Sequence, residues 1–411
     1  MVNDNDQLVL LTNEFPDGNG ETFLESEIAI LSEHFSKIRI VPFSLPHRII
    51  RTVPENVAIH SIRKSAKVSN LLLIKNFLVF CKFFLIDFYF QSKKISYLKN
   101  FRAYVSIFKT ALFFSKGLKK IIDDENLRNA LFYSYWMDVS AVALSILKYK
   151  SSISRYIFRT HGFDLYEGRR KDGIIPFKYS VLFNSNKCFT ISAHGYNYLN
   201  LQERFRNKIS LSYLGVTDHG ALNPLNLHKE FIIVSCSNLV PIKRVDLIAR
   251  ALQKVTFSAI WIHFGDGDEM NTIRKLIESL PKNIKVILKG RVTNLHILDF
   301  YQKNQVNLFV NVSKSEGLPV SIMEAISFGI PVMATDVGGT SEIVNKQTGI
   351  LLPESVSSES LAEEIILFAN SDLNKKEFRK GVRNFYLSNF NAKENYKNFA
   401  LSLKAIDSNQ K

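Results

Sequence analysis

The sequence is poor in cysteine. Its 411 residues include three cysteines, Cys81, Cys188 and Cys236, which lie far apart and form no CxxC pair. An odd number of widely spaced cysteines predicts neither a disulfide framework nor a cysteine zinc site. The pattern fits a reducing compartment, and we expect the protein to be cytoplasmic.

The pattern of a leader and long apolar runs are also not seen in this sequence. The first residues, MVNDNDQLVLLTNEF, contain no basic stretch followed by an apolar one, so we expect no signal peptide. In the most apolar segment, NLLLIKNFLVFCKFFLIDFYF (70–90), charges at Lys75, Lys82 and Asp87 interrupt the run. It therefore contains no stretch of about 18–20 apolar residues, the length that a membrane-spanning helix needs.

Acidic residues are almost missing from residues 61–122. This window holds thirteen lysines and arginines against one acid, Asp87, so it carries most of the net charge of +15. It is also rich in Phe, Leu and Ile, and a basic, aromatic helical segment can lie on an anionic membrane surface. The alternative is a helix packed on the protein with solvated lysines. No signature of a nucleic-acid-binding module is present, so we expect no nucleic acid partner.

Short β-branched or aromatic runs alternate with helical patterns along most of the chain. They predict strands at 8–12, 37–43, 130–136, 155–160, 187–192, 208–214, 230–237, 257–265, 283–290, 306–311 and 331–335. Such alternation predicts an α/β protein with parallel sheets covered on both faces. These strands are too many for one comfortable open sheet. A polar, turn-rich segment (217–230) precedes a new strand, so we expect one domain over 1–217 and a second over 218–390.

The segment SEGLPVSIMEAISFGIPVMATDVGG carries two acids, Glu316 and Glu324, among apolar and glycine-rich neighbours. Pro319 suits the first turn of a short helix, and Gly329 suits its end. Glu316 then lies in the loop before a helix N-terminus, where free N–H groups attract phosphate or sugar oxygens. Two carboxylates beside such a terminus predict the neutral hydroxyls of a sugar and a ribose. The alternative is a buried helix with a capping acid.

The E-x7-E pattern of this segment resembles the retaining glycosyltransferases of family 4, which have the GT-B fold. In that family the first glutamate faces the donor sugar and the second binds the ribose of the nucleotide. The resemblance implies a catalytic role for Glu316 and ribose binding by Glu324. It also places near the diphosphate or sugar the backbone at Gly317, Leu318, Pro319 and Val320.

The segment SCSNLVPIKRVDLIARAL (235–252) is similar to a second region of that family. Lys243 matches the lysine that neutralises the donor diphosphate, and a cation is needed there as the leaving nucleotide takes up negative charge. The arginine that is usual in the family is Asn238 here, and Arg244 is the candidate to replace it. By their residue types alone, Lys243 and Arg244 could instead be a solvated helix start.

The segment IHFGDGDEM resembles the family's G-x-G turn after a strand, with Gly265 and Gly267 near the donor. Asp266 and Asp268 in the same turn also mimic a D-x-D metal site. The turn context argues against a metal, and the resemblance implies that none is needed. We therefore expect no metal and no cofactor beside the nucleotide sugar.

Two further loops fit the expected donor site. KGRVTN resembles the loop near the donor base, with Arg291 and Val292 as contacts. NEFPDGNGETFLESEIAIL resembles the family's first glycine-rich loop, in which Gly18 and Gly20 would let the backbone approach phosphates. Without the resemblance, this second stretch could be an ordinary strand–turn–helix.

The segment RTHGFDLYEGR follows a predicted strand and is similar to the part of the family that carries its histidine. His161 would contact the donor sugar, and it is our third catalytic candidate. Asp164 and Arg169 lie nearby and are candidates for acceptor binding. A lone histidine is more often structural, and its place at a strand end favours the functional interpretation.

The resemblance covers 231–353 most fully, 9–31 and 155–216 in part, and the region from about 44 to 128 not at all. It implies two Rossmann-like domains that face a central cleft, with a C-terminal helix (391–411) packed back on the first domain. The implied activity is metal-independent transfer of a hexose, with retention, from a UDP-sugar.

The expected acceptor is a glycan or lipid-linked saccharide of a cell-surface polysaccharide, such as exopolysaccharide or lipopolysaccharide. The enzyme would then act as a peripheral protein on the inner face of the plasma membrane. A GT-B nucleotide-sugar epimerase and a non-catalytic nucleotide-sugar-binding scaffold remain as alternatives.

Overall fold

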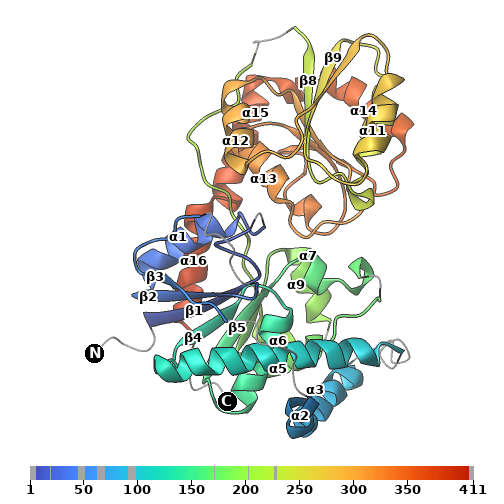
Figure 1. The fold of residues 1–411 in the computed structure, drawn as a ribbon. Helices are drawn as coiled ribbons and strands as arrows, with labels where there is room; N and C mark the ends of the chain where they lie inside the picture. The colour runs from blue at the N-terminus through green and yellow to red at the C-terminus, as the bar shows by residue number, and fades with distance from the viewer. Residues whose placement is uncertain are drawn as a thin grey trace. The chain divides into compact units, whose positions relative to one another are not determined.

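The computed structural model of the protein forms two compact units (Figure 1): unit 1 comprises Met1–Tyr213 with Tyr396–Lys411, and unit 2 comprises Leu214–Asn395. The division lies shortly before the boundary expected at 217. The structure describes residues 6–18, 20–44, 51–62, 70–90, 99–170, 172–201, 203–225 and 229–406. The basic stretches 63–69 and 91–98 and the end of the expected C-terminal helix, 407–411, lie outside these residues.

Unit 1 is built on a parallel sheet of order β3-β2-β1-β4-β5-β6-β7. Its strands are β1 (Gln7–Thr12), β2 (Lys37–Pro42), β3 (Val57–Ile59), β4 (Leu131–Ser134), β5 (Arg155–Thr160), β6 (Lys187–Thr190) and β7 (Ile209–Leu211). Its main helices are α1 (Leu24–His34), α2 (Asn70–Lys75), α3 (Phe77–Phe90), α5 (Phe101–Asp124), α6 (Val139–Tyr149), α7 (Gly162–Leu165), α8 (Lys178–Asn184), α9 (Ala193–Asn200) and α16 (Ala392–Lys404). β5 is buried along its whole length, as expected of a strand covered on both faces.

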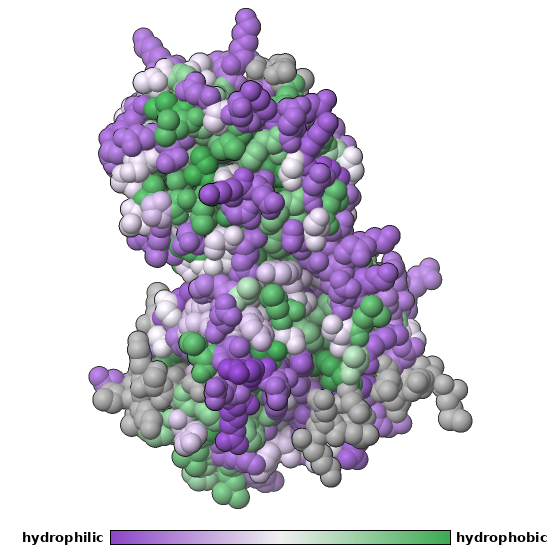
Figure 2. Space-filling view, turned by 180° about the vertical axis from the view of Figure 1, so that it is seen from behind, coloured by the Kyte–Doolittle hydropathy of each residue, from purple (hydrophilic) through white to green (hydrophobic). Residues whose placement is uncertain are grey.

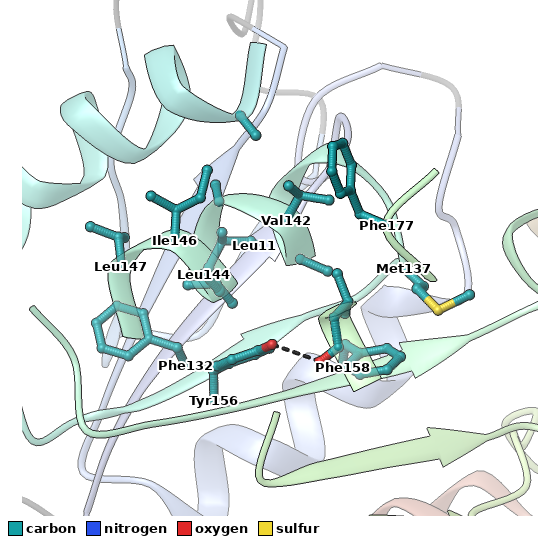
Figure 3. Packing of buried hydrophobic residues seen from close by; sticks show 14 of the residues in the cluster. Leu11, Phe132, Met137, Val142, Leu144, Ile146, Leu147, Tyr156, Phe158 and Phe177 are labelled. Atoms are coloured by element: carbon teal, nitrogen blue, oxygen red, sulfur yellow. Dashed lines mark hydrogen bonds between the residues drawn. The ribbon is translucent and has the colours of Figure 1, made fainter. Parts of the chain in front are cut away.

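Alternate residues of the unit 1 strands enter two hydrophobic clusters, because successive side chains of a strand point to opposite faces. Val9 and Leu11 of β1 join the cluster that includes α5 and α6. Figure 3 shows part of it, with Leu11, Phe132 and Tyr156 beside Val142 and Ile146 of α6. Leu8 and Leu10 join a second cluster with α1 and α16. Helices therefore cover both faces of the sheet.

A buried ion pair lies on the side of α1 and α16. Arg159 of β5 and Glu27 of α1 are both fully buried, and Nη1 of Arg159 lies 2.6 Å from Oε2 of Glu27. The Tyr133 hydroxyl donates to the same carboxylate. The Arg159 guanidinium lies 3.9 Å above the ring of Phe399 in α16. The last helix is therefore part of the unit 1 core.

Unit 2 has a parallel sheet of order β10-β9-β8-β11-β12-β13. Its strands are β8 (Phe231–Cys236), β9 (Ala259–Phe264), β10 (Ile284–Leu288), β11 (Leu308–Asn311), β12 (Val332–Thr335) and β13 (Gly349–Leu352). Its main helices are α10 (Val245–Leu252), α11 (Met270–Glu278), α12 (Asn294–Lys303), α13 (Val320–Ser327), α14 (Ser358–Ala369) and α15 (Lys376–Asn389). The predicted class, two Rossmann-like domains with parallel sheets, is confirmed.

Every predicted strand corresponds to a strand in the described residues. The sequence did not predict β3 and β13, which are three and four residues long. Such short edge strands carry too few residues for a pattern of alternation to emerge. Within the described ranges, no helix is both long enough and apolar enough to cross a membrane.

Candidate functional site

The predicted donor-site residues of unit 2 lie in loops that follow the carboxyl ends of its strands. Ligands bind at this edge in open parallel sheets. The loop after β8 leads to the 3-10 turn Pro241–Lys243, and the loop after β11 leads to α13. The two loops are joined, because the N–H of Lys314 donates to the carbonyl of Ile242 at 2.8 Å.

The structure brings Lys243 and Glu316 together. Nζ of Lys243 lies 2.6 Å from Oε1 of Glu316, and Nδ2 of Asn311 lies 3.4 Å from the same oxygen. Glu316 is buried, and the Lys243 side chain is 22 % exposed. A buried carboxylate needs such a partner, since leaving it unpaired is costly. An anionic ligand on Lys243 would free Glu316 to accept bonds from hydroxyl groups.

The backbone around Glu316 is held by the loop after β12. A Cβ atom at Gly338, where φ is +57°, would lie 2.0 Å from the carbonyl oxygen of Glu316. The N–H of Gly339 donates to the carbonyl of Gly317 at 2.8 Å. Pro319, the residue before α13, makes no side-chain hydrogen bond to cap the helix. The first N–H groups of α13, which have no acceptor within a helix, therefore receive none from this residue.

Glu324 of α13 is buried, and its carboxylate accepts a hydrogen bond from a side-chain amide. Nδ2 of Asn294, in the first turn of α12, donates to Oε1 of Glu324 at 2.6 Å. Burial raises the pKa of Glu324 from 4.5 to about 7, and the bond from Asn294 opposes this rise. Cys236, at the end of β8, lies within electrostatic reach, and burial raises its pKa to about 12. Sequence reasoning missed Asn294, although it ends the predicted base-binding segment KGRVTN.

Gly265 and Gly267 allow the turn after β9 to approach the loop after β8. A Cβ atom at Gly265 would lie 1.8 Å from the carbonyl oxygen of Ser237, and one at Gly267 would lie 2.4 Å from that of Leu239. Between them, Asp266 is exposed and accepts from the N–H of Gly267. The described ranges contain no group of three or more acid, His or Cys side chains that could hold a metal ion.

The remaining donor-site candidates of unit 2 differ in their surroundings. Arg244 donates through Nε to the carbonyl of Val312 at 2.7 Å, and Nη2 lies 3.4 Å from the Ser313 carbonyl. Its guanidinium therefore joins the two loops. Two further candidates, Asn238 and Arg291, are exposed. Val292 is partly buried, and Leu318 is buried.

In unit 1, the glycine-rich loop after β1 is organised by two glutamates. A Cβ atom at Gly18, where φ is +70°, would lie 2.3 Å from Oε2 of Glu14, and one at Gly20 would lie 3.3 Å from it. The carboxylate of Glu21 accepts from three successive N–H groups, those of residues 13–15, at 2.8–3.0 Å. These amides, which could hold an anion, bind a side chain of the chain itself.

His161 lies directly after β5 and precedes α7. Its N–H donates to Oδ1 of Asp164 at 2.6 Å, and Oδ2 of Asp164 accepts from the N–H of Met137 at 2.8 Å. The carboxylate of Asp164 thus serves the backbone. Arg169, the second acceptor candidate, ends the 3-10 turn Glu167–Arg169 and is partly buried. His161 is 7 % exposed, and both its ring nitrogens are buried without a hydrogen-bond partner among the described residues, with Nδ1 at 3.8 Å from Oδ2 of Asp164.

Comparisons with known proteins identify the family of the chain. The model of the family "Glycosyl transferases group 1" matches residues 223–385. An uncharacterised glycosyltransferase of Methanocaldococcus jannaschii is 30 % identical over 286 residues, which are 65 % of this chain and 77 % of that protein. The chain therefore belongs to the group 1 glycosyltransferases, and the resemblance seen in its sequence is confirmed.

Other relatives match over shorter stretches. A poly(ribitol-phosphate) α-N-acetylglucosaminyltransferase of Staphylococcus aureus is 30 % identical over 39 % of this chain and 32 % of its own. An O-antigen biosynthesis glycosyltransferase of Escherichia coli is 26 % identical over 40 % of this chain and 47 % of its own.

Solved structures share the fold over nearly the whole chain. HepE of Anabaena, in complex with UDP, has a TM-score of 0.68 at 15 % identity and covers 97 % of this chain and 100 % of its own. Sucrose-phosphate synthase of Thermosynechococcus elongatus has a TM-score of 0.72 at 14 % identity, with 96 % and 98 % covered. The fold is GT-B.

Proposed function

We propose that this glycosyltransferase transfers a sugar from a UDP-sugar to a saccharide or lipid-linked saccharide, with retention of the anomeric configuration and without a metal. The observation that carries the proposal is the pair of Lys243 and Glu316 beside the N-terminus of α13, with Glu324 in the same helix. A cation and free N–H groups suit a diphosphate, and two carboxylates suit the hydroxyls of a sugar and a ribose.

In this proposal the donor diphosphate binds Lys243 and replaces Glu316 as the ion-pair partner of the lysine. The lysine and the first N–H groups of α13 stabilise the charge that develops as the bond from the anomeric carbon to the diphosphate breaks. An acceptor hydroxyl bonds to the anomeric carbon from the face that the diphosphate leaves, and its proton passes to the departing diphosphate oxygen. Lys243 supplies the positive charge that a metal would otherwise supply, and positioning contributes much of the rate.

The choice of UDP and of the acceptor class draws on the relatives. HepE of Anabaena is solved with UDP and with UDP-glucose. The relative from Escherichia coli is named for O-antigen biosynthesis, and that of Staphylococcus aureus for poly(ribitol-phosphate). These names support, for the present chain, a role in the biosynthesis of a cell-surface polysaccharide.

We further propose that unit 1 binds an anionic membrane surface through one face of α2 and α3. Along these helices, large side chains at spacings of four and seven positions are largely exposed: Ile74 is 70 %, Leu78 82 %, Leu85 61 % and Tyr89 73 % exposed. Figure 1 shows α2 and α3 at the foot of unit 1, where Figure 2 shows hydrophobic residues at the surface. An exposed apolar stripe of this kind marks an interaction site, and the excess of lysine and arginine around it suits anionic lipid.

The first test of the transferase proposal is thermal stabilisation by UDP, GDP and their sugar conjugates. A ligand that binds only the folded protein raises its apparent stability. We expect a rise in Tm with UDP and UDP-sugars that is weakened in Glu324→Ala. Turnover with acceptor then separates a transferase from an epimerase, which releases no free nucleotide, and from a scaffold. No rise with any nucleotide at millimolar levels would contradict the proposal.

A further inference from the structure

Three aromatic rings gather around His161 at the carboxyl edge of the unit 1 sheet. Tyr135 and Trp136 directly follow β4, and Phe23 directly precedes α1. The ring centroids of Trp136, Tyr135 and Phe23 lie 4.2, 4.7 and 6.3 Å from that of His161. Because ligands of parallel sheets bind at the carboxyl edge, this aromatic cluster lies where a ligand of unit 1 is expected.

The imidazole inside the cluster has unused hydrogen-bonding capacity. Both ring nitrogens of His161 and the hydroxyl of Tyr135 are buried, and none has a hydrogen-bond partner among the described residues; Nδ1 of His161 lies 3.8 Å from Oδ2 of Asp164, beyond hydrogen-bonding distance. Leaving a buried polar atom without a partner is costly. Native proteins hold few such groups, and each calls for an explanation, of which a missing ligand is one. A ligand that both donates and accepts hydrogen bonds, as a hydroxyl does, would satisfy the imidazole.

Trp136 is held in place by an unusual partner. Its Nε1–H donates to Oε1 of Glu21 at 2.5 Å, and the same carboxylate accepts from the N–H groups of residues 13–15. Glu21 itself is buried and has a left-handed φ of +55°. The indole thus has its polar edge satisfied, yet the side chain is only partly buried. Part of the indole therefore remains accessible to a ligand.

The charge around the cluster selects the kind of ligand. The carboxylates of Glu21 and Asp164 lie beside it; Asp138, which caps α6 two residues after Trp136, adds less negative charge because burial raises its pKa to about 7. Negative charge of this kind opposes a phosphate or a uronate. Aromatic faces with a few polar groups are typical of sites for small ligands that are part apolar and part polar. A neutral pyranose combines an apolar C–H face with hydroxyl groups.

We propose that Trp136 is the stacking platform of a site for a neutral pyranose ring, that His161 hydrogen-bonds a hydroxyl of this ring, and that Glu21 positions the indole. The inference rests on the proposed function for one point only, namely that the bound saccharide is the acceptor.

The protein contains two tryptophans, and this allows a direct test by fluorescence. Trp261 of unit 2 is fully buried, so quenching by acrylamide reports mainly on Trp136. The probes are the methyl glycosides of glucose, galactose and N-acetylglucosamine, with glucuronate as the charged comparison. We expect at least one neutral glycoside to bind in the millimolar range, to change the emission and to reduce quenching, and glucuronate to have no effect.

Variants separate stacking from a structural role. Binding, measured by ligand-observed NMR, should weaken at least about tenfold in Trp136→Leu and by less in Trp136→Phe, which keeps an aromatic face. Glu21→Gln should weaken it to an intermediate degree and increase the quenching of Trp136. An unchanged circular dichroism spectrum and an unchanged Tm without ligand in each variant show that the fold is intact.

Two outcomes overturn the proposal: no neutral glycoside protects Trp136, or binding is the same in Trp136→Leu as in the wild type. If wild-type protein shows no Tm rise with UDP-glucose but its Trp136 is protected by a glycoside, the donor proposal fails and the saccharide site stands.

Discussion

At the scale of single residues, the two acids of the E-x7-E pattern have different surroundings. Glu316 is paired with Lys243 at 2.6 Å, whereas Glu324 accepts from the amide of Asn294 at the same distance. A cation favours the charged form of a carboxylate, and burial disfavours it. Burial accordingly raises the pKa of Glu324 to about 7. Two acids eight positions apart are thus suited to different roles by their partners.

The first prediction concerns turnover. Glu316→Gln and Lys243→Ala should each lower kcat at least about a hundredfold, because each removes a group that acts on the sugar or on the leaving diphosphate. Steady-state release of UDP in the presence of acceptor measures this. Glu363→Gln, an exposed acid on α14, is the matched control and should retain full activity. Full activity in either site variant would refute the assignment.

The second prediction concerns pH. Glu324 holds a proton below its pKa of about 7, and ribose hydroxyls favour the charged form. Affinity for UDP-glucose should therefore rise with pH, by up to about tenfold between about pH 6 and pH 8. The diphosphate of UDP-glucose does not titrate in this range, which makes it a better probe than UDP. Calorimetry should show a much flatter profile for Glu324→Gln, and an equal slope in both proteins would exclude Glu324 as the cause.

At the scale of elements, the single acid of the basic window serves the fold and not the surface. Asp87 of α3 is fully buried and accepts from the hydroxyl of Tyr104 and from the N–H groups of Tyr179 and Ser180. It therefore joins α3 to α5 and α8. Since this acid points inward, the exposed charge near α2 and α3 is positive, at Lys75 and Lys82.

The third prediction tests the membrane face. The double variant Leu78→Ser with Leu85→Ser should bind vesicles of anionic lipid at least about tenfold more weakly, because two large exposed side chains lose their apolar area. Co-sedimentation at low salt measures the binding, which should also fall as salt rises. Leu367→Ser, which changes a leucine that is 64 % exposed on α14, is the control. Wild-type protein that does not sediment with anionic vesicles would rule out this face as a membrane site.

At the scale of the whole molecule, the chain passes from unit 1 to unit 2 and back again. Unit 1 ends its first stretch at Tyr213 and resumes at Tyr396. On its return, α16 places Phe399, Ala400 and Leu403 in the cluster that holds Leu8 of β1. Residues from the two ends of the chain thus share one core, and unit 1 is incomplete without the last helix.

The fourth prediction follows from this shared core. Phe399→Ala should lower the free energy of unfolding of unit 1 by about 3 kcal/mol or more, the usual cost of removing a buried phenyl ring. It also leaves Arg159 without the ring below it. Leu401→Ala, on the same helix but 50 % exposed, should cost less than about 0.5 kcal/mol. Urea unfolding followed by circular dichroism compares the two, and equal effects would show that α16 does not belong to this core.

Most strands could be predicted because they are buried on both faces and therefore read as short apolar runs. The candidates for the donor site could be selected from the sequence for a similar reason: Glu316, Glu324 and Lys243 lie in contiguous segments with recognisable patterns. The parts that Asn294, Glu21 and Trp136 play in the fold could not be predicted from the sequence. Each acts through a partner far away in the sequence, 30 positions for Asn294 and Glu324 and 115 for Trp136 and Glu21, and no local pattern encodes such a pairing.

By itself, therefore, the sequence determined the class of fold, the family and the loops that carry the donor-site candidates, because periodicity and motifs are local properties of the chain. The tertiary structure alone decided which charges neutralise each other, which acid is buried and which aromatic rings surround His161. Those outcomes depend on distances and on exclusion from water, and both arise only when segments remote in the sequence pack together.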